Sequence, residues 1–443
     1  MTSRLLAGAV LLVSVLVAWL AISSTLAARV LQGLIGLSMV YVGYLAWRGW
    51  SAMREPIRAG HSGAGNAIGD ATGRPWISVV VPARNEATVV ADVVSDLGRQ
   101  AYADAQGPRF DVLVVDDGST DATSQRARAA AAPFGDRVQV VRRDAGEGPP
   151  TKAAVLRFAQ PSVRGEIVAV IDADTRLGPD FLERVTRAWE RDSTAAAIQA
   201  QRRAMNASAG WLAAAQDEEQ LMDMASQCGR WAMDGTAELR GNGMFVRRAA
   251  LEALGGWDER ALTEDLDLST RLVAAGEHVA LAPEADLREE ALEHLRPFWH
   301  QRLRWAEGSL RRLMERGPTL VANRALPARR RLDFVLFIGE FVIPPLFVTS
   351  IAASVVTVVL PGPADWSVPL ALMLGYGLGS FMLGLAGLAA HGVRGWRLLG
   401  RAARGALFLS HWLLVVPAAL LRIGLGPRAV AFAQTPRVGR GAT

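Results

Sequence analysis

Long apolar runs constrain the fold of this 443-residue chain more than any other feature. Two lie at residues 5–22 and 30–47, and three more lie at 332–360, 368–390 and 406–421. A helix of about 20 apolar residues crosses the ~30 Å hydrocarbon core of a bilayer. The sequence therefore predicts an integral, multi-pass membrane protein.

The first run also fits a second interpretation. Arg4 precedes it and small residues follow it, as in a signal peptide, although cleavage would still leave the second run as an anchor. The single cysteine, Cys228, excludes a disulfide framework and a cysteine-based zinc site.

Arginines cluster beside the apolar runs. They follow the second run, precede the third and separate the fourth from the fifth: Arg48, Arg54 and Arg58; Arg329, Arg330 and Arg331; Arg394, Arg397, Arg401 and Arg404. By the positive-inside rule these flanks face the cytoplasm, together with the polar region 51–331. Because the flanks explain the basic pI of about 10.0, we expect no nucleic-acid partner.

The polar region has an α/β pattern. After a glycine-rich linker, buried strands are predicted at 76–82, 110–115, 137–141 and 167–170, with helical patterns after the first two. Such alternation predicts a mostly parallel, Rossmann-like sheet with helices on both faces.

Polar residues follow three of the predicted strands. They are Pro82 to Glu86, Asp116 to Ser119, and the pair Asp172 and Asp174. An Asp-x-Asp pair alone settles nothing, since Asp265 and Asp267 form another. Ligands of parallel α/β sheets bind at the carboxyl ends of the strands, so we expect the three segments to meet in one site.

Six segments in order, "VVVPARNEA", "VVDDGSTD", "DADT", "GNGMFVRR", "TEDLDL" and "QRLRW", resemble the membrane-embedded family 2 glycosyltransferases. Cellulose, hyaluronan and poly-N-acetylglucosamine synthases belong to this family, as do several glycolipid synthases. The resemblance covers about residues 77–305 and implies a GT-A catalytic domain with a UDP-sugar donor.

For the donor, the resemblance implies that Asp172 and Asp174 hold Mg²⁺ or Mn²⁺ and that Asp117, with Asp116, binds uracil. Pro82, Asn85 and Glu86 would line the nucleotide pocket, and Lys152 would lie on the donor side. Hard divalent cations prefer carboxylate oxygens and act as Lewis acids on a departing diphosphate. An Asx-type turn that caps the next helix is the simpler interpretation of "DDGST".

For the acceptor, the resemblance implies that Asp265 is the catalytic base, with Glu264 beside it. A base must remove the proton of the attacking hydroxyl in an inverting transfer. The competing interpretation is a helix start, with Thr263 as the N-cap and acidic residues in the first turn.

The "QRLRW" segment would contribute Gln301, Arg302, Arg304 and Trp305. The arginines would bind the diphosphate, since a planar guanidinium suits phosphate oxygens, while Gln301 and Trp305 would line the acceptor site. The alternative is an amphipathic helix that rests on anionic lipid.

The predicted organisation is a transmembrane hairpin at 1–50, a linker at 51–75 and a GT-A domain at 76–296. An interfacial helix at 297–331, transmembrane helices at 332–424 and a tail at 425–443 follow. Five simple spans would place the tail outside, against its arginines, so either 332–360, with Pro344 and Pro345, is re-entrant or double, or one run does not cross.

The sequence favours a processive β-linked polysaccharide synthase of the bacterial inner membrane, with its catalytic domain in the cytoplasm. Its partners would be a UDP-sugar, the bilayer, a growing glycan and subunits for secretion. The main alternative is a non-processive enzyme that glycosylates a membrane lipid such as diacylglycerol. More remote alternatives are a transporter with a regulatory domain and a nucleotidyltransferase.

Overall fold

The computed structural model describes residues 2–54, 74–144, 146–359 and 366–426. These residues form two compact units. The sheet unit comprises the described residues of 74–207 and 237–291, and the helical unit comprises those of 2–54, 208–236 and 292–426. Most of the predicted linker and most of the predicted tail lie outside the described residues.

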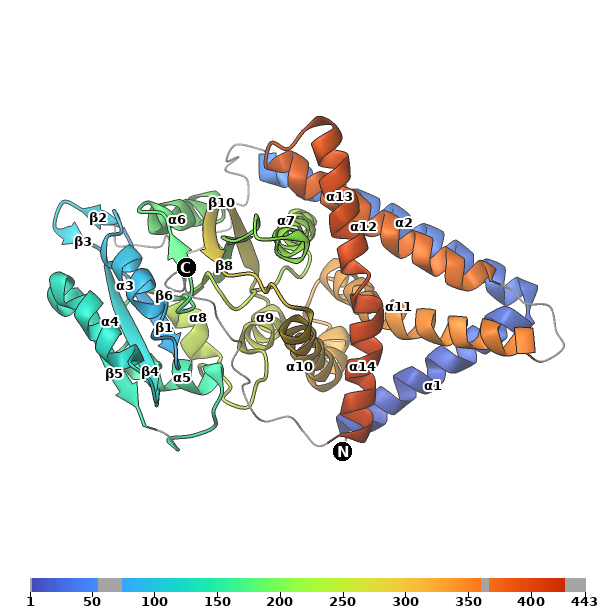
Figure 1. The fold of residues 1–443 in the computed structure, drawn as a ribbon, viewed down its shortest axis with the longest axis horizontal. Coiled ribbons are helices and arrows are strands. Elements are labelled where there is room, and N and C mark those ends of the chain that lie inside the picture. The colour runs from blue at the N-terminus through green and yellow to red at the C-terminus, as the bar shows by residue number, and fades with distance from the viewer. Residues whose placement is uncertain (1, 55–73, 145, 360–365, 427–443) are drawn as a thin grey trace. The chain divides into compact units, whose positions relative to one another are not determined.

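The sheet unit has one large sheet (Figure 1). Its order is β5 (Val138–Arg143), β4 (Phe110–Asp117), β1 (Ile77–Ala83), β6 (Ile167–Val170), β9 (Met244–Arg247), β8 (Ala197–Ala204), β10 (Val279–Glu289) and β7 (Arg176–Leu177). The first four strands are parallel, β9 is antiparallel to both neighbours, and β10 is parallel to β8 and antiparallel to β7. The predicted mostly parallel sheet is confirmed. A separate hairpin joins β2 (Ala103–Asp104) and β3 (Gly107–Pro108).

Helices cover both faces of this sheet. They are α3 (Val90–Gly98), α4 (Thr123–Ala131), α5 (Lys152–Ala159), α6 (Phe181–Arg191), α8 (Arg248–Ala253) and α9 (Glu264–Ala274), with 3-10 turns at Ala132–Arg137 and Gln160–Ser162. Val80 packs in a core with Leu156 and Leu272 of α5 and α9, while its neighbours Val79 and Val81 are equally buried on the other face. Burial on both faces explains the continuous apolar strands of the sequence.

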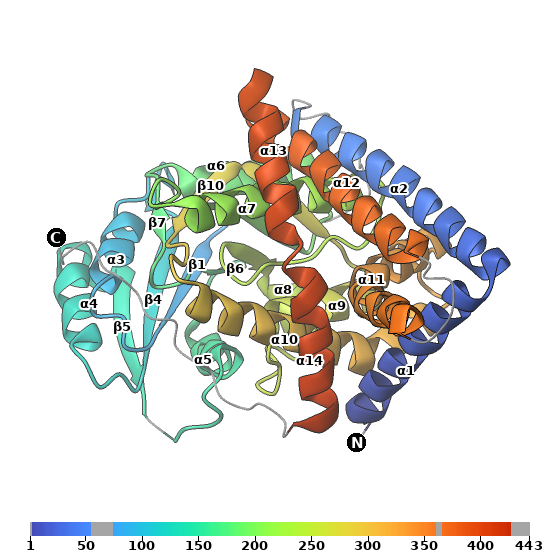
Figure 2. The same ribbon diagram turned by 45° about the vertical axis from the view of Figure 1, so that its right-hand side comes forward.

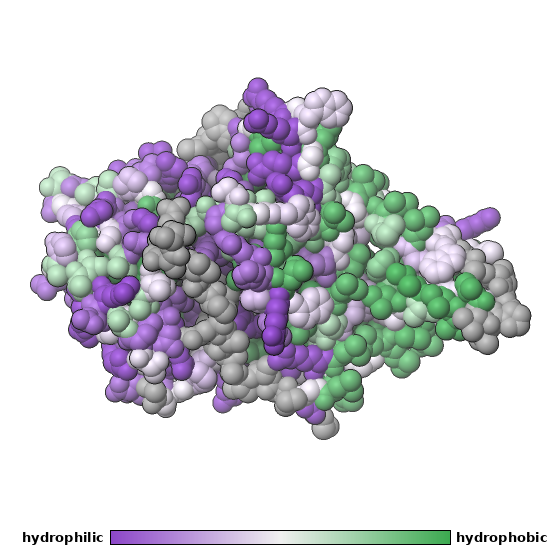
Figure 3. Space-filling model, viewed as in Figure 1, coloured by the Kyte–Doolittle hydropathy of each residue, from purple (hydrophilic) through white to green (hydrophobic). Residues whose placement is uncertain are grey.

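The helical unit contains α1 (Thr2–Ser23), α2 (Thr25–Arg54), α7 (Trp211–Ala232), α10 (Leu295–Ala322), α11 (Ala328–Val359), α12 (Ser367–Ala390), α13 (Gly395–Leu409) and α14 (Trp412–Leu425). Five segments of the described chain are long and apolar enough to span a membrane: Ser3–Ser23, Thr25–Arg54, Ala328–Val358, Ser367–Ala390 and Gly395–Leu425. Apolar residues gather over α1, α2, α11 and α12 (Figure 3). The helix α11 runs unbroken through Pro344 and Pro345.

Helix α7 packs within the helical unit, so the predicted domain at 76–296 is interrupted by residues 208–236. A Cβ atom on Gly49 of α2 would lie 2.0 Å from the carbonyl oxygen of Ala225 in α7, and one on Gly229 would lie 2.4 Å from the carbonyl oxygen of Leu45. The two backbones can approach this closely only because both positions are glycine.

Candidate active site

The loops after β1 and β4 are joined by hydrogen bonds. The backbone N–H of Asn85 donates to Ser119 Oγ (2.9 Å), and Asn85 Oδ1 accepts from the N–H of Thr120 (2.8 Å). The N–H of Glu86 donates to Thr123 Oγ1 (2.8 Å). Asn85 has a positive φ of 53°, a conformation that asparagine tolerates better than most residues. Two of the predicted nucleotide-pocket residues, Asn85 and Glu86, are therefore hydrogen-bonded to the segment that follows β4.

The two aspartates at the end of β4 have different partners. Asp116 is fully buried, and its Oδ1 accepts from the N–H of Ser119 (2.9 Å), which is the turn-capping bond of the simpler interpretation. Asp117 Oδ1 accepts from Nε of the buried Arg143 (2.7 Å), while Arg84 lies 3.4 Å from Asp117 Oδ2. Asp116 thus shapes the turn and also pairs with Arg142 (3.1 Å), while Asp117 pairs with Arg143 and Arg84.

Lys152 contacts two acidic residues of the site, Asp172 and Glu264. Its Nζ lies 2.6 Å from Asp172 Oδ1, 2.8 Å from the carbonyl oxygen of Gly241 and 3.3 Å from Glu264 Oε1. Thr151 caps helix α5 by accepting from the N–H of Ala154 (3.1 Å), which fixes the first residue of the helix. The sequence placed Lys152 on the donor side, and the structure places it beside the Asp-x-Asp pair.

Asp265, in the first turn of α9, places its carboxylate near Gly241, which also contacts Lys152. A Cβ atom added to Gly241 would lie 3.2 Å from Asp265 Oδ2 and 3.9 Å from Lys152 Nζ. Gly241 also has a φ of +78°, which favours glycine. Thr263 occupies the N-cap position of α9 but makes no capping hydrogen bond with its side chain, while Glu264, Asp265 and Asp267 lie in the first turn of the helix.

Burial shifts the protonation of this cluster. It raises the pKa of Glu264 to about 7, against an opposing effect of Lys152. Burial also raises the pKa of Asp265. For Lys152, burial would lower the pKa, but the carboxylates of Asp172 and Glu264 outweigh it and raise the pKa. A permanently charged lysine beside carboxylates that protonate more easily than usual is typical of a catalytic site.

The Asp-x-Asp pair fits a cation that shares its ligands with a substrate. Asp174 is buried, and Asp172 is partly exposed beside Lys152. No group of three or more His, Cys, Asp or Glu side chains in the described chain could hold a metal by itself. Mg²⁺ is commonly bound by one or two carboxylates plus substrate phosphates, and two aspartates on one loop provide that donor set.

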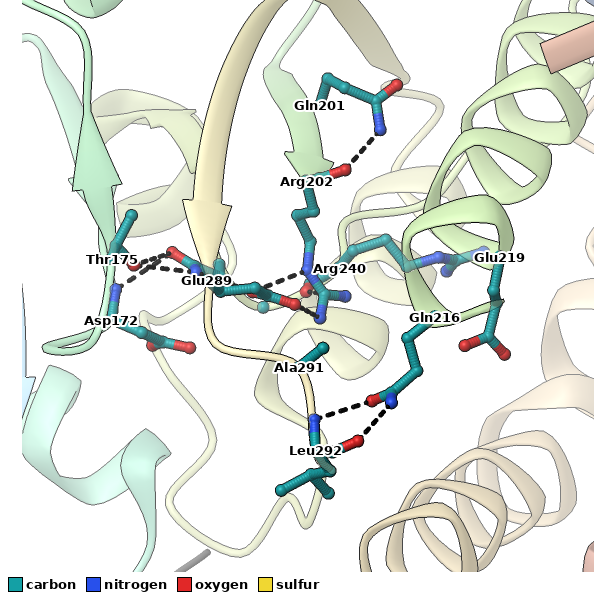
Figure 4. Close-up of polar contacts among 12 residues, drawn as sticks. Asp172, Thr175, Gln201, Arg202, Gln216, Glu219, Arg240, Glu289, Ala291 and Leu292 are labelled. Atoms are coloured by element: carbon teal, nitrogen blue, oxygen red, sulfur yellow. Dashed lines mark hydrogen bonds and ion pairs between the residues drawn. The ribbon is translucent and has the colours of Figure 1, made fainter. Parts of the chain in front are cut away.

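Asn242 links this loop to the far part of the sheet, where Glu289 pairs with Arg202 (Figure 4). Its Oδ1 accepts from the N–H of Asp172 (3.1 Å), and its Nδ2 donates to Thr175 Oγ1 (3.0 Å) and Glu289 Oε2 (3.0 Å). Glu289 in turn accepts from Arg202 at the end of β8 (2.6 Å). Asn242 is almost completely buried, so it fixes the backbone of the Asp-x-Asp loop.

The four predicted residues of "QRLRW" lie on α10 in the helical unit. Arg302 is buried and paired with Glu219 of α7, and its guanidinium lies 4.3 Å from the ring centre of Trp305. Gln301, Arg304 and Trp305 are half-buried. A diphosphate contact by Arg302 would require the pair with Glu219 to open.

Sequence reasoning missed three residues that shape these environments. Arg143, Asn242 and Glu219 contact residues that lie 26, 70 and 83 positions away in the chain. The "GNG" segment marked the position of Asn242 but gave no indication of its partners. These pairings depend on sheet register and helix packing, which local patterns do not encode.

The family model described as "Glycosyltransferase like family 2" matches residues 74–308. The chain is 31% identical to a beta-monoglucosyldiacylglycerol synthase of Trichormus variabilis, over 83% of this chain and 77% of that protein. It is 25% identical to an N-acetylglucosaminyltransferase of Rhizobium leguminosarum, over 74% and 75% of the two chains. The fold is similar to that of a Pyrobaculum calidifontis mannosyltransferase solved with GDP-Man and Mn²⁺ (TM-score 0.59, 20% identity, 89% of this chain and 98% of the other).

Proposed function

Because the chain belongs to glycosyltransferase family 2, we propose that it transfers a sugar from a UDP-sugar, with inversion, to the hydroxyl of a membrane lipid such as diacylglycerol. The cluster of Lys152, Asp172, Glu264 and Asp265 carries the proposal of catalysis. The reaction would take place at a bacterial cytoplasmic membrane, with the spans of the helical unit as its anchor.

The lipid product replaces the polysaccharide that the sequence favoured. Three relatives that are 30–31% identical over 83% of this chain are named beta-monoglucosyldiacylglycerol synthases. The "QRLRW" segment leans toward a processive enzyme, but glycolipid synthases can carry similar segments, so it does not separate the two products. A sugar hydroxyl and a glycerol hydroxyl need the same proton acceptor, so the product class follows from the relatives and not from the acidic cluster.

The proposed roles divide the site into a donor side and an acceptor side. On the donor side, Asp117 binds the uracil and Asn85 and Glu86 help to shape the nucleotide pocket, while Asp172 and Asp174 would hold Mg²⁺ or Mn²⁺. When bound, the cation neutralises charge on the departing diphosphate. Lys152 orients Asp172 through their 2.6 Å ion pair and adds a positive charge beside the phosphates.

On the acceptor side, Asp265 acts as the base. It removes the hydroxyl proton as the acceptor oxygen forms its bond to C1 and the bond from C1 to the diphosphate oxygen breaks, so UDP leaves with the bonding electrons. A positioned base contributes typically about 10²–10⁴-fold to the rate. The raised pKa of Asp265 makes its carboxylate a stronger base than an exposed aspartate.

The test is transfer from separate labelled UDP-sugars to diacylglycerol by purified protein, with Mg²⁺ or Mn²⁺. Labelled product in the chloroform-soluble fraction supports the proposal, whereas product in the ethanol-insoluble fraction supports a polysaccharide synthase. The Asp265→Asn variant should lose the product, since asparagine cannot accept the proton. The matched control is Asp267→Asn, because Asp267 instead pairs with Arg271 (2.7 Å) on the same helix and should leave transfer active. Metal-independent transfer, or an active Asp265→Asn variant, would contradict the assigned roles.

A further inference from the structure

Helices α13 and α14 form one nearly continuous rod. The turn between them keeps helical backbone angles at Ser410 and His411, and the N–H of Leu413 donates to the carbonyl oxygen of Ser410 (3.1 Å). Figures 1 and 2 both show the rod running across the direction of α1, α2, α11 and α12. The rod meets α1 at its first turns, where Ala7 packs with Val416 and Ala419.

One face of the rod is tied to polar helices by charged residues. Arg401 and Arg404 of α13 bind Glu218 of α7 (Nε to Oε distances of 2.9 and 2.8 Å), and Glu218 is fully buried. Near the other end, Arg422 lies 3.2 Å from Glu307 of α10. The apolar segments found in the described chain include neither α7 nor α10. A rod inside the hydrocarbon core would draw these ion pairs, and the polar helices that carry them, into the membrane, where ionised side chains are costly.

The lengths lead to the same conclusion. The segment Gly395–Leu425 has 31 residues, or about 46 Å of helix, but its arginine-free part, between Arg404 and Arg422, is limited to residues 405–421. That part is about 26 Å long, shorter than the ~30 Å hydrocarbon core. A crossing rod would therefore bring Arg404 or Arg422, with its partner Glu218 or Glu307, to the edge of the hydrocarbon or into it.

The opposite face of the rod carries an exposed apolar stripe at helical spacing: Trp396, Leu399, Leu407, Leu414, Leu421 and Leu425. Trp396 and Leu425, at its two ends, are 87% and 86% exposed. Two exposed arginines, Arg394 and Arg397, lie beside Trp396. An apolar stripe with tryptophan and arginine at its edge is the pattern of a helix in the headgroup layer, where the arginines meet lipid phosphates.

We propose that the α13–α14 rod lies in the headgroup layer of the bilayer and does not cross it, with the stripe against the acyl chains. The described part of the chain then crosses four times, through α1, α2, α11 and α12. An even number places the described polar residues between α2 and α11 and the C-terminal end of the rod on one side. This arrangement removes the conflict between five spans and the cytoplasmic arginines, and it does not depend on the proposed substrate.

The experiment labels single cysteines with a membrane-impermeant maleimide in sealed vesicles of both orientations. The test variants are Trp396→Cys and Leu425→Cys, at exposed positions on either end of the rod. Glu190→Cys, exposed in the sheet unit, marks one side of the membrane, and Thr25→Cys, at the exposed first residue of α2, marks the other. The native Cys228 is buried and is replaced by serine as a background.

The proposal expects both ends of the rod to react from the side of Glu190→Cys. Reaction of the two ends from opposite sides would show a crossing helix and overturn the proposal. Depth is measured independently with a spin label at Leu407→Cys and at Leu414→Cys, by the relative access of oxygen and a water-soluble nickel complex. Similar shallow depths are expected, and a depth at the bilayer centre for either label would also overturn it. Retained maleimide labelling of Glu190→Cys and Thr25→Cys from opposite sides confirms that the protein is inserted.

Discussion

Replacing Asn242 by alanine tests whether the Asp-x-Asp loop depends on a distant side chain for its position. The substitution removes the acceptor of the Asp172 N–H and the donor to Thr175 Oγ1. Asn242 is only 2% exposed, so water does not easily replace it. Each orphaned buried group costs about 1–3 kcal/mol, while Glu289 keeps its bonds to Arg202. For the two orphaned groups together, we expect a loss of about 2–6 kcal/mol in the free energy of unfolding.

The effect on function should exceed what lost stability explains. A displacement of about 1 Å at a reacting group can cost 10²-fold in rate. We therefore expect kcat/KM to fall on the order of 100-fold for Asn242→Ala, with a higher metal concentration needed for half-maximal transfer. Transfer is measured over a series of Mn²⁺ concentrations, at a temperature where the variant is folded by circular dichroism.

The matched control is Asn206→Ala. Asn206 lies in the same unit and also bonds two backbone groups, the N–H (2.8 Å) and carbonyl oxygen (2.9 Å) of Ala291. Its loss should lower the melting temperature without changing the metal dependence. If the two variants show the same metal dependence and the same kcat/KM, Asn242 is only a structural residue and the reasoning is wrong.

Three further predictions concern stability. In metal-free protein, the free energy of unfolding should fall as the pH rises from about 4.5 to about 7, because folded Glu264 holds a proton that the unfolded chain has already released. Glu264→Gln should weaken this pH dependence in a series of thermal melts. An unchanged dependence of stability on pH would contradict the raised pKa of Glu264. Glu219→Gln should cost about 3–5 kcal/mol, since it leaves the buried Arg302 charge uncompensated, and an unchanged melting temperature would show that the pair contributes nothing. Gly49→Ala should lower the melting temperature by forcing α2 away from α7. The control Gly36→Ala should not, because a Cβ atom at Gly36 has no atom within 4 Å. Equal melting temperatures of the two variants would refute the close crossing.

The strand ends of the site were predictable because they follow from two local signals. Continuous apolar runs marked β1, β4 and β6, and parallel pairing of β1 with both neighbours brings their ends together. Helix α7 was not predictable in this way. Its acidic residues Asp217 and Glu218 interrupt the apolar pattern of the helix. The reason they can be buried is that they pair with an arginine of α13 more than 180 positions away. When the partners of charged residues lie so far away in the sequence, the local pattern predicts a solvent-exposed helix.

The same limit applies to the fifth apolar run and to the product. Hydropathy measures whether residues 406–421 could enter a bilayer, but the ion pairs of Arg401 and Arg404 with Glu218 decide how the preceding helix is held. For the product, Asp265 performs the same proton transfer whether the acceptor is a sugar or a glycerol hydroxyl, so residues of the acidic cluster cannot separate the two. A lipid acceptor differs because no polymer has to pass through the membrane. Four spans with a surface rod then need only to anchor the enzyme and do not have to enclose a secretion channel. The number of crossings and the solubility of the product are therefore linked measurements: a crossing rod together with an ethanol-insoluble product would favour the synthase that the sequence first suggested.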